Sequence, residues 1–175
     1  MELKLNVNGI FSRKIIPRLN KGDEYHLVDI NKKFCRDLRR QFRRLPNVKV
    51  FCQSIFDFKG MGKYDHVISG LPLNSFPPKK VQQFYALCER LTKEGGTFSD
   101  FHYRFLPAIR KLYLTPVQRQ NFRAVLEQEE QFYQRYGTGK KTVYRNIPPA
   151  QVAHHRLITG KKALPTFKPQ SPAMS

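Results

Sequence analysis

An aspartate at the end of a short apolar run is the first residue whose type and position suit a chemical role. Asp29 closes the segment Leu27-Val28-Asp29, and Asn31 follows at the expected start of a helix. A carboxylate at the end of a parallel strand can accept hydrogen bonds from both ribose hydroxyls of a nucleoside cofactor. The alternative is that the carboxylate caps the following helix. Asp29 is therefore a candidate cofactor-binding residue.

The elements that must position this residue alternate along the chain. Strands are predicted over Glu2–Val7, Glu24–Ile30, Val48–Cys52, Tyr64–Ser69, Thr97–Tyr103, Lys141–Arg145 and Gln151–Ile158. Helical segments are predicted over Ile10–Leu19, Asn31–Arg44, Pro78–Thr92 and Thr115–Tyr136. This order predicts an α/β domain with a mostly parallel seven-strand sheet, helices on both faces, and an antiparallel pair formed by the last two strands. Ligands of such sheets bind at the carboxyl ends of the strands.

Three segments carry a resemblance to a known family. They are Ile68-Ser69-Gly70-Leu71-Pro72, Gly95-Gly96-Thr97-Phe98-Ser99-Asp100-Phe101-His102-Tyr103 and Asn146-Ile147-Pro148-Pro149-Ala150-Gln151-Val152. In this order they resemble motifs of the bacterial phosphatidylethanolamine N-methyltransferases, which are related to the ribosomal RNA adenine dimethylases. The resemblance covers about residues 2 to 160 and implies a Rossmann-like class I methyltransferase domain over residues 1–160. Residues 161–175 are predicted to form a basic, proline-containing, disordered tail.

The resemblance implies an activity and a set of site residues. The activity is methyl transfer from S-adenosylmethionine to the amine of a phospholipid at the cytosolic membrane surface. It implies that Gly9, Asp29, Ser54, Ser69 and Gly70 bind the cofactor and that Leu71, Pro72, Leu73 and Asn74 form the substrate loop. Tyr103 and Asp100 are candidates to orient or receive the proton that the amine must lose. Their alternative roles are a core-facing tyrosine and a surface aspartate.

The cofactor loop departs from the family pattern. Leu3, Leu5 and Val7 stand where the family has an acid and two glycines, and only Gly9 of the glycines is kept. Side chains at Leu5 and Val7 would crowd the amino-acid end of the cofactor. The sequence therefore predicts weak or absent binding of S-adenosylmethionine. A catalytically inactive methyltransferase-fold module that binds anionic membrane remains an alternative function.

A second alternative is an RNA-binding relative of the adenine dimethylases. The corresponding loop of those enzymes has an asparagine that accepts a hydrogen bond from the target amino group and a tyrosine that stacks on the flipped base. This chain has Gly70 and Leu73 at these two places. Nucleic acid is therefore the less favoured partner.

The charge of the chain also points to a polyanionic partner. Its formal net charge is +19, which favours nucleic acid or an anionic membrane surface. The residues predicted to bind anionic phospholipid are Arg39, Arg40, Arg43, Arg44, Arg110 and Lys111. The last two lie in a basic and apolar segment suited to a membrane interface. Neither a signal pattern nor an apolar run of about 18 to 20 residues is present, so a cytoplasmic, peripherally membrane-associated protein is expected.

The cysteines and the paired histidines predict no metal site. Cys35, Cys52 and Cys88 are widely spaced and form no CxxC pair, so buried reduced thiols are expected. His154 and His155 are adjacent on a predicted strand and should point to opposite sides. Both are expected to be exposed surface residues.

Overall fold

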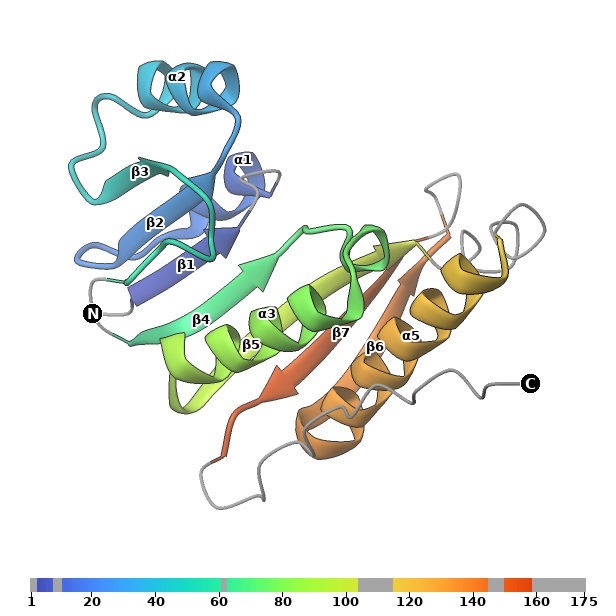
Figure 1. Cartoon of the computed structure of the whole chain (residues 1–175). Helices are drawn as coiled ribbons and strands as arrows, with labels where there is room; N and C mark the ends of the chain where they lie inside the picture. The colour runs from blue at the N-terminus through green and yellow to red at the C-terminus, as the bar shows by residue number, and fades with distance from the viewer. Residues whose placement is uncertain (1–2, 8–10, 61–62, 104–114, 145–149, 159–175) are drawn as a thin grey trace, which may run out of the picture.

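The computed structural model describes residues 3–7, 11–60, 63–103, 115–144 and 150–158 of the chain, and these residues build one twisted sheet with its helices (Figure 1). The strands are β1 Leu3–Val7, β2 Glu24–Asp29, β3 Val48–Cys52, β4 Tyr64–Ser69, β5 Thr92–Tyr103, β6 Gly137–Val143 and β7 Ala150–Arg156. The helical elements are α1 Ser12–Ile15, η1 Ile16–Arg18, α2 Lys32–Gln41, η2 Leu73–Ser75, α3 Pro78–Leu91 and α5 Pro116–Tyr136.

The strands lie in the order β3-β2-β1-β4-β5-β7-β6. Strands β1 to β5 pair in parallel, whereas β7 pairs antiparallel with both β5 and β6. This arrangement confirms the predicted α/β class and the antiparallel final pair. The chain order reverses between β1 and β4, and ligands of open α/β sheets bind beside such a switch point.

Helices cover the two faces of the sheet in separate groups. On one face Ile16 of η1 and Leu38 of α2 pack with Tyr25 and Leu27 of β2. On the other face α3 and α5 pack against β4 and β5, and this larger core includes Phe84, Tyr85, Phe98 and Phe132. Tyr85 and Phe132 stack with ring centroids 4.3 Å apart, which joins the two helices above Phe98.

Two predicted helix starts are confirmed by their capping contacts. The side chain of Asn31 accepts a hydrogen bond from the Phe34 amide and caps α2. Thr115 and Gln118 form a reciprocal capping box at the start of α5. The end of α2 differs from the prediction, because the helix stops at Gln41 rather than near Arg44.

Two strands begin earlier than the sequence pattern predicts. Strand β5 starts at Thr92 rather than Thr97, with a register shift opposite Tyr64 and His66. Strand β6 starts at Gly137, directly after α5. Gly137 has an ordinary φ of −61°, and its role is close packing, since a Cβ atom there would lie 2.5 Å from the Tyr133 ring.

A buried histidine joins three strands in the middle of the sheet. His26 of β2 is fully buried; its Nδ1 lies 2.9 Å from the Tyr64 hydroxyl and its Nε2 lies 3.2 Å from the Glu24 carboxylate. Glu24 also accepts a hydrogen bond from Lys49 of β3 at 3.2 Å. Burial, followed by the positive charge of Lys49, lowers the pKa of His26 below its ordinary 6.5.

This pKa shift predicts that the fold is less stable in mild acid. Below about pH 6.5 the unfolded chain binds a proton at His26 that the folded chain binds only at lower pH, so stability falls as pH falls through this window. The melting temperature should therefore decrease between about pH 7 and pH 5.5, and H26Q should reduce this slope. In the control H154Q, which alters an exposed histidine, the slope should persist; an unchanged slope in H26Q would contradict the assignment.

Candidate cofactor and substrate site

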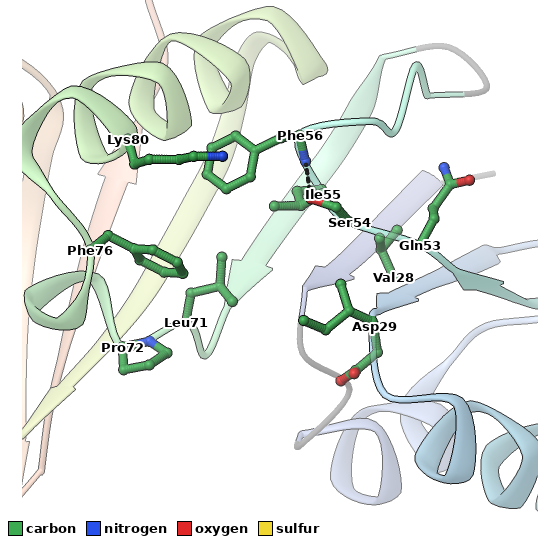
Figure 2. A pocket seen from close by; sticks show the side chains of 11 residues that line it. Val28, Asp29, Gln53, Ser54, Ile55, Phe56, Leu71, Pro72, Phe76 and Lys80 are labelled. Atoms are coloured by element: carbon green, nitrogen blue, oxygen red, sulfur yellow. Dashed lines mark hydrogen bonds between the residues drawn. The ribbon is translucent and has the colours of Figure 1, made fainter.

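A cavity of about 420 Å³ opens at the carboxyl ends of β2, β3 and β4 (Figure 2). Its walls come from the end of β2, the loop after β3, the loop after β4 and the first turn of α3. The lining residues are Val28, Asp29, Ile30, Gln53, Ser54, Ile55, Phe56, Leu71, Pro72, Phe76 and Lys80. Four predicted site residues are therefore brought together in one place: Asp29, Ser54, Leu71 and Pro72.

Asp29 presents a partly used carboxylate to this cavity. It is the last residue of β2 and is half-buried. Its Oδ1 accepts a hydrogen bond of 2.7 Å from the Asn31 amide, so it shapes the turn before α2, whose N-cap is Asn31 and not Asp29. Among the described residues the second oxygen, Oδ2, has no hydrogen-bond partner. One oxygen of Asp29 therefore orients the turn, and the other can accept a hydrogen bond from a ligand.

The loop after β3 forms the second wall. Ser54 is half-buried, and its hydroxyl oxygen accepts a hydrogen bond of 3.2 Å from the Phe56 amide. This bond tightens the turn and leaves the hydroxyl proton available as a donor. Ile55 and Phe56 add apolar surface on either side. The wall therefore combines the apolar side chains of Ile55 and Phe56 with the polar groups of Gln53 and Ser54.

The loop after β4 places the substrate-loop candidates in different environments. Leu71 and Pro72 line the cavity opposite Asp29. Ser69 is buried, and its hydroxyl oxygen accepts a hydrogen bond of 3.2 Å from the Leu71 amide, so it shapes the loop. Leu73 is buried in the core beneath α3 and α5, and Asn74 lies in η2. Gly70, Leu73 and Asn74 are not among the lining residues, so the cavity contains only part of the predicted loop.

The sequence did not predict the residues that form one rim of the cavity. The Lys80 ammonium lies 4.4 Å from the centroid of the Phe56 ring, and the Phe56 and Phe76 rings meet edge to face at 6.3 Å. Figure 2 shows the Lys80 side chain extended across the Phe56 ring. No sequence motif marks these three residues, because Phe56 and Lys80 come from separate segments that only the fold brings together.

Asp100 does not line this cavity, and its burial corrects the alternative that it is a surface aspartate, whereas its predicted role in receiving the amine proton stays a prediction. It is 3% exposed on the α3 and α5 face of the sheet, and its Oδ1 lies 3.2 Å from Nε2 of His155. Strand alternation explains the position, because Asp100 shares its face with Phe98, whose ring stacks on the buried His155 ring at 5.3 Å. Its contact with His155 ties β5 to β7 within the core.

The two adjacent histidines lie on opposite sides of their strand, as predicted, but they differ in exposure. His154 is exposed and its Nδ1 lies 2.8 Å from the Ser99 hydroxyl, whereas His155 is 2% exposed. They therefore point to opposite sides of β7, which confirms the alternation. The prediction that both are surface residues is wrong for His155, because Asp100 gives its ring a buried partner.

Several predicted site residues lie outside the described part of the chain. These are Gly9, Arg110 and Lys111. The backbone of Tyr103 pairs with Ala150 at the end of β5, but its side chain also falls outside the described part. The roles predicted for these residues, and for the segment Arg104–Leu114, stay predictions.

The basic residues predicted for membrane binding belong to a larger charged surface. The exposed cations of the layer formed by α1, η1, α2 and the adjoining turns are Arg13, Lys14, Arg18, Lys21, Lys32, Lys33, Arg36, Arg39, Arg40, Arg43 and Arg44, and we call this surface the α1/α2 basic face. The four acidic residues of the same stretch are buried or half-buried. The positive potential of this layer is therefore only weakly offset locally.

The cavity fits the nucleoside part of a cofactor. Apolar side chains from β2 and from the loops after β3 and β4 provide flat walls for an aromatic base, as ligand pockets commonly do. The free oxygen of Asp29 provides a charged acceptor for a ribose hydroxyl at the edge of these walls. Together, the strand order and this site define a Rossmann-like fold of S-adenosylmethionine-dependent methyltransferases.

Comparison with known proteins agrees with this class and gives the family. A model described as "Methyltransferase domain" matches residues 7–96, which is more than half of the chain. The chain belongs to this methyltransferase domain family. No curated protein sequence matches it.

Solved structures show the same fold at low sequence identity. The N-methyltransferase NodS from Bradyrhizobium japonicum WM9 is 10% identical, with a TM-score of 0.66 over 90% of this chain and 86% of that chain. Its complex with S-adenosyl-L-homocysteine gives 11% identity and a TM-score of 0.65 over 89% and 78% of the two chains. Magnesium protoporphyrin IX methyltransferase from Synechocystis PCC 6803, with S-adenosyl-L-homocysteine bound, gives 14% identity and a TM-score of 0.61 over 89% and 73% of the two chains.

Proposed function

We propose that the chain binds S-adenosylmethionine in this cavity and transfers its methyl group to the amine of a phospholipid headgroup. The observation that carries the cofactor part is the meeting of Asp29, Ser54, Leu71 and Pro72 around one cavity at the carboxyl edge of the sheet. S-adenosylmethionine supplies a methyl group on a positively charged sulfur, which an uncharged amine can accept.

The residues of the chain would contribute binding and orientation to this reaction. Asp29 would hold the ribose through its free oxygen, and the apolar walls would exclude water from the base. Positioning of two reactants supplies a large part of the rate in such transfers. Tyr103 remains the candidate for orienting the amine or receiving its proton, because its backbone ends β5 at the same edge of the sheet as Asp29.

Two features support a phospholipid as the methyl acceptor. The sequence Ser69-Gly70-Leu71-Pro72 resembles the corresponding loop of phospholipid N-methyltransferases, and Leu71 and Pro72 line the cavity. The α1/α2 basic face would attract an anionic membrane, with a contribution of about 1 kcal/mol per positive charge near the surface. We propose that this face binds peripherally at the cytosolic surface. No helix in the described part of the chain has the length and hydrophobicity to span a membrane.

Methyl transfer to vesicles tests this function directly. Vesicles of phosphatidylethanolamine and phosphatidylglycerol are incubated with radiolabelled S-adenosylmethionine, and methylated lipid is measured. We expect labelled lipid, and we expect none with phosphatidylcholine in place of phosphatidylethanolamine, because its nitrogen is already fully methylated. The quadruple variant R39E/R40E/R43E/R44E should reduce vesicle binding at least about tenfold, since it reverses four charges near the surface.

The controls separate the alternatives. K140E/K141E reverses two charges on β6, at the far edge of the sheet from α2, and should retain most of the binding. Salt-sensitive vesicle binding without methyl transfer would identify a catalytically inactive membrane module. Tighter binding to RNA than to vesicles, lost in the quadruple variant, would instead favour the RNA-binding alternative.

A further inference from the structure

Two cysteine thiols meet beside Asp29, and the proposed methyl transfer uses neither. Cys35 lies on α2 and is fully buried, and its thiol donates a hydrogen bond of 3.3 Å to the Asp29 carbonyl oxygen. Cys52 is the last residue of β3, is half-buried, and pairs directly with Asp29 in the parallel ladder of β2 and β3. Asp29 therefore accepts a hydrogen bond from Cys35 and lies opposite Cys52 in the sheet.

The orientation of the strands directs both thiols to the same place. Val48 and Val50 of β3 pack into the core beneath α2, and strand alternation brings Cys52 to this same face. Burial, followed by the hydrogen bond and charge of the neighbouring Cys52 side chain, raises the pKa of the Cys35 thiol to about 12. Both thiols therefore lie beside Asp29 on the α2 side of the sheet, in the layer between α2 and the strands.

Neither a metal site nor simple core packing accounts for this pair of thiols. A metal site would need further ligands, and the described residues contain no group of three or more histidine, cysteine, aspartate or glutamate side chains that could hold an ion. Core packing explains one buried thiol, as it does for Cys88 beneath α3. It does not require a second thiol that is only half-buried and adjacent to the first.

We propose that Cys35 and Cys52 form a reversible disulfide when the protein meets a peroxide. The bond would tie α2 to the end of β3 beside Asp29. Most disulfides of reducing compartments are transient and redox-sensing, which fits a pair of thiols that stand free in this structure.

The chemistry of the step balances with one peroxide molecule. The half-buried Cys52 sulfur attacks one peroxide oxygen; an S–O bond forms, the O–O bond breaks, and the departing hydroxide takes the thiol proton as water. The Cys35 sulfur then attacks the Cys52 sulfur; the S–S bond forms, the S–O bond breaks, and the leaving hydroxide takes the Cys35 proton as a second water. The two thiols lose two electrons and two protons, and the peroxide is reduced.

The disulfide would affect the cofactor site through Asp29. It removes the Cys35 hydrogen that is bonded to the Asp29 carbonyl oxygen, and it holds the Cα atoms of the two cysteines about 4.4–6.8 Å apart, which fixes α2 against the end of β3. This consequence rests on the proposed function, since it assumes that Asp29 binds the ribose. Formation of the bond does not depend on that assumption.

Peptide mapping tests the bond itself. The full chain is treated with hydrogen peroxide, its remaining thiols are alkylated, and it is digested with trypsin, which separates Cys35, Cys52 and Cys88 into the peptides 34–36, 50–59 and 81–90. We expect peptides 34–36 and 50–59 to appear joined, with the loss of two hydrogen atoms, and to separate on reduction with dithiothreitol. Peptide 81–90 should stay alkylated. Recovery of Cys35 as a free thiol after Cys52 is oxidised, or a bridge to Cys88, would overturn the proposal.

A second measurement separates this proposal from the proposed function. S-adenosylhomocysteine is titrated into the reduced and the oxidised chain, and oxidation should weaken binding by about three- to tenfold, the equivalent of roughly one hydrogen bond. C52S should form no bridge and show equal affinity before and after peroxide. A bridge that leaves the affinity unchanged would overturn the link to Asp29. If the reduced chain does not bind, the proposed function fails, while the mapped bridge still stands.

Discussion

Replacement of Asp29 by alanine is expected to weaken the binding of S-adenosylhomocysteine by between about tenfold and a hundredfold. The reason is that hydrogen bonds to a charged acceptor contribute roughly 1.5–3 kcal/mol, and Asp29 is the one carboxylate among the residues found to line the cavity. Isothermal titration calorimetry on D29A and the unmodified chain measures the difference. D29N keeps an acceptor for the Asn31 amide but removes the charge, so it should fall between the two.

The control for this experiment is another carboxylate of the same region. Asp37 lies on α2 outside the cavity, and D37A changes the net charge of the chain as much as D29A does. Its affinity should equal that of the unmodified chain, and equal affinities for D29A and D37A would contradict the assignment. Side chains at Leu5 and Val7 are predicted to weaken binding, so the L5G/V7G variant is measured as well. It should bind S-adenosylhomocysteine more tightly than the unmodified chain as long as Asp29 is intact.

Replacement of Asp100 by alanine is expected to destabilise the fold by about 2–6 kcal/mol, because it leaves two buried groups, Nε2 of His155 and the Tyr85 hydroxyl, without their carboxylate partner at roughly 1–3 kcal/mol each. The side chains of Asp100 and His155 are 4% and 2% exposed, and they join β5 to β7. A loss of this size lowers the melting temperature of a chain of this length by about 4 to 24 °C. Thermal unfolding followed by circular dichroism measures it.

Two variants distinguish this structural role from a catalytic one. S99A alters the neighbouring residue of β5, whose hydroxyl contacts the exposed His154 on the opposite face, and should cost no more than about 1.5 kcal/mol. D100L/H155F replaces both members of the pair by apolar residues and should recover part of the lost stability, since only the Tyr85 hydroxyl then lacks its partner. If D100A instead melts like the unmodified chain but loses methyl transfer, the proton-accepting role predicted from the sequence would be restored.

The elements themselves could be predicted from local features of the sequence. Short apolar runs mark β2 and β3, and Asn31 and Thr115 cap their helices through side-chain contacts within three residues. The position of Asp29 at a strand end could be predicted in the same way. Such features act between near neighbours in the chain, so their effect does not depend on how the rest of the protein folds.

The boundaries of β5 and β6 were set by packing rather than by pattern. The segment Gly137–Lys140 has no apolar alternation, yet it extends β6 because its backbone pairs with β7 and Gly137 packs tightly against Tyr133. Strand pairing and close contact can involve residues that are distant in sequence. The pattern of residue types within one segment therefore does not predict them.

The sequence by itself therefore determined the α/β class, the alternation of strands and helices that gives a mostly parallel sheet, and the candidate role of Asp29. Only the tertiary structure decided which residues share a site. It placed Lys80 against Phe56 at the rim of the cavity, and it buried Asp100 with His155, which lies 55 positions further along the chain. The physical reason is that a residue type fixes what a side chain can donate or accept, whereas its partner depends on which strands and helices pack together.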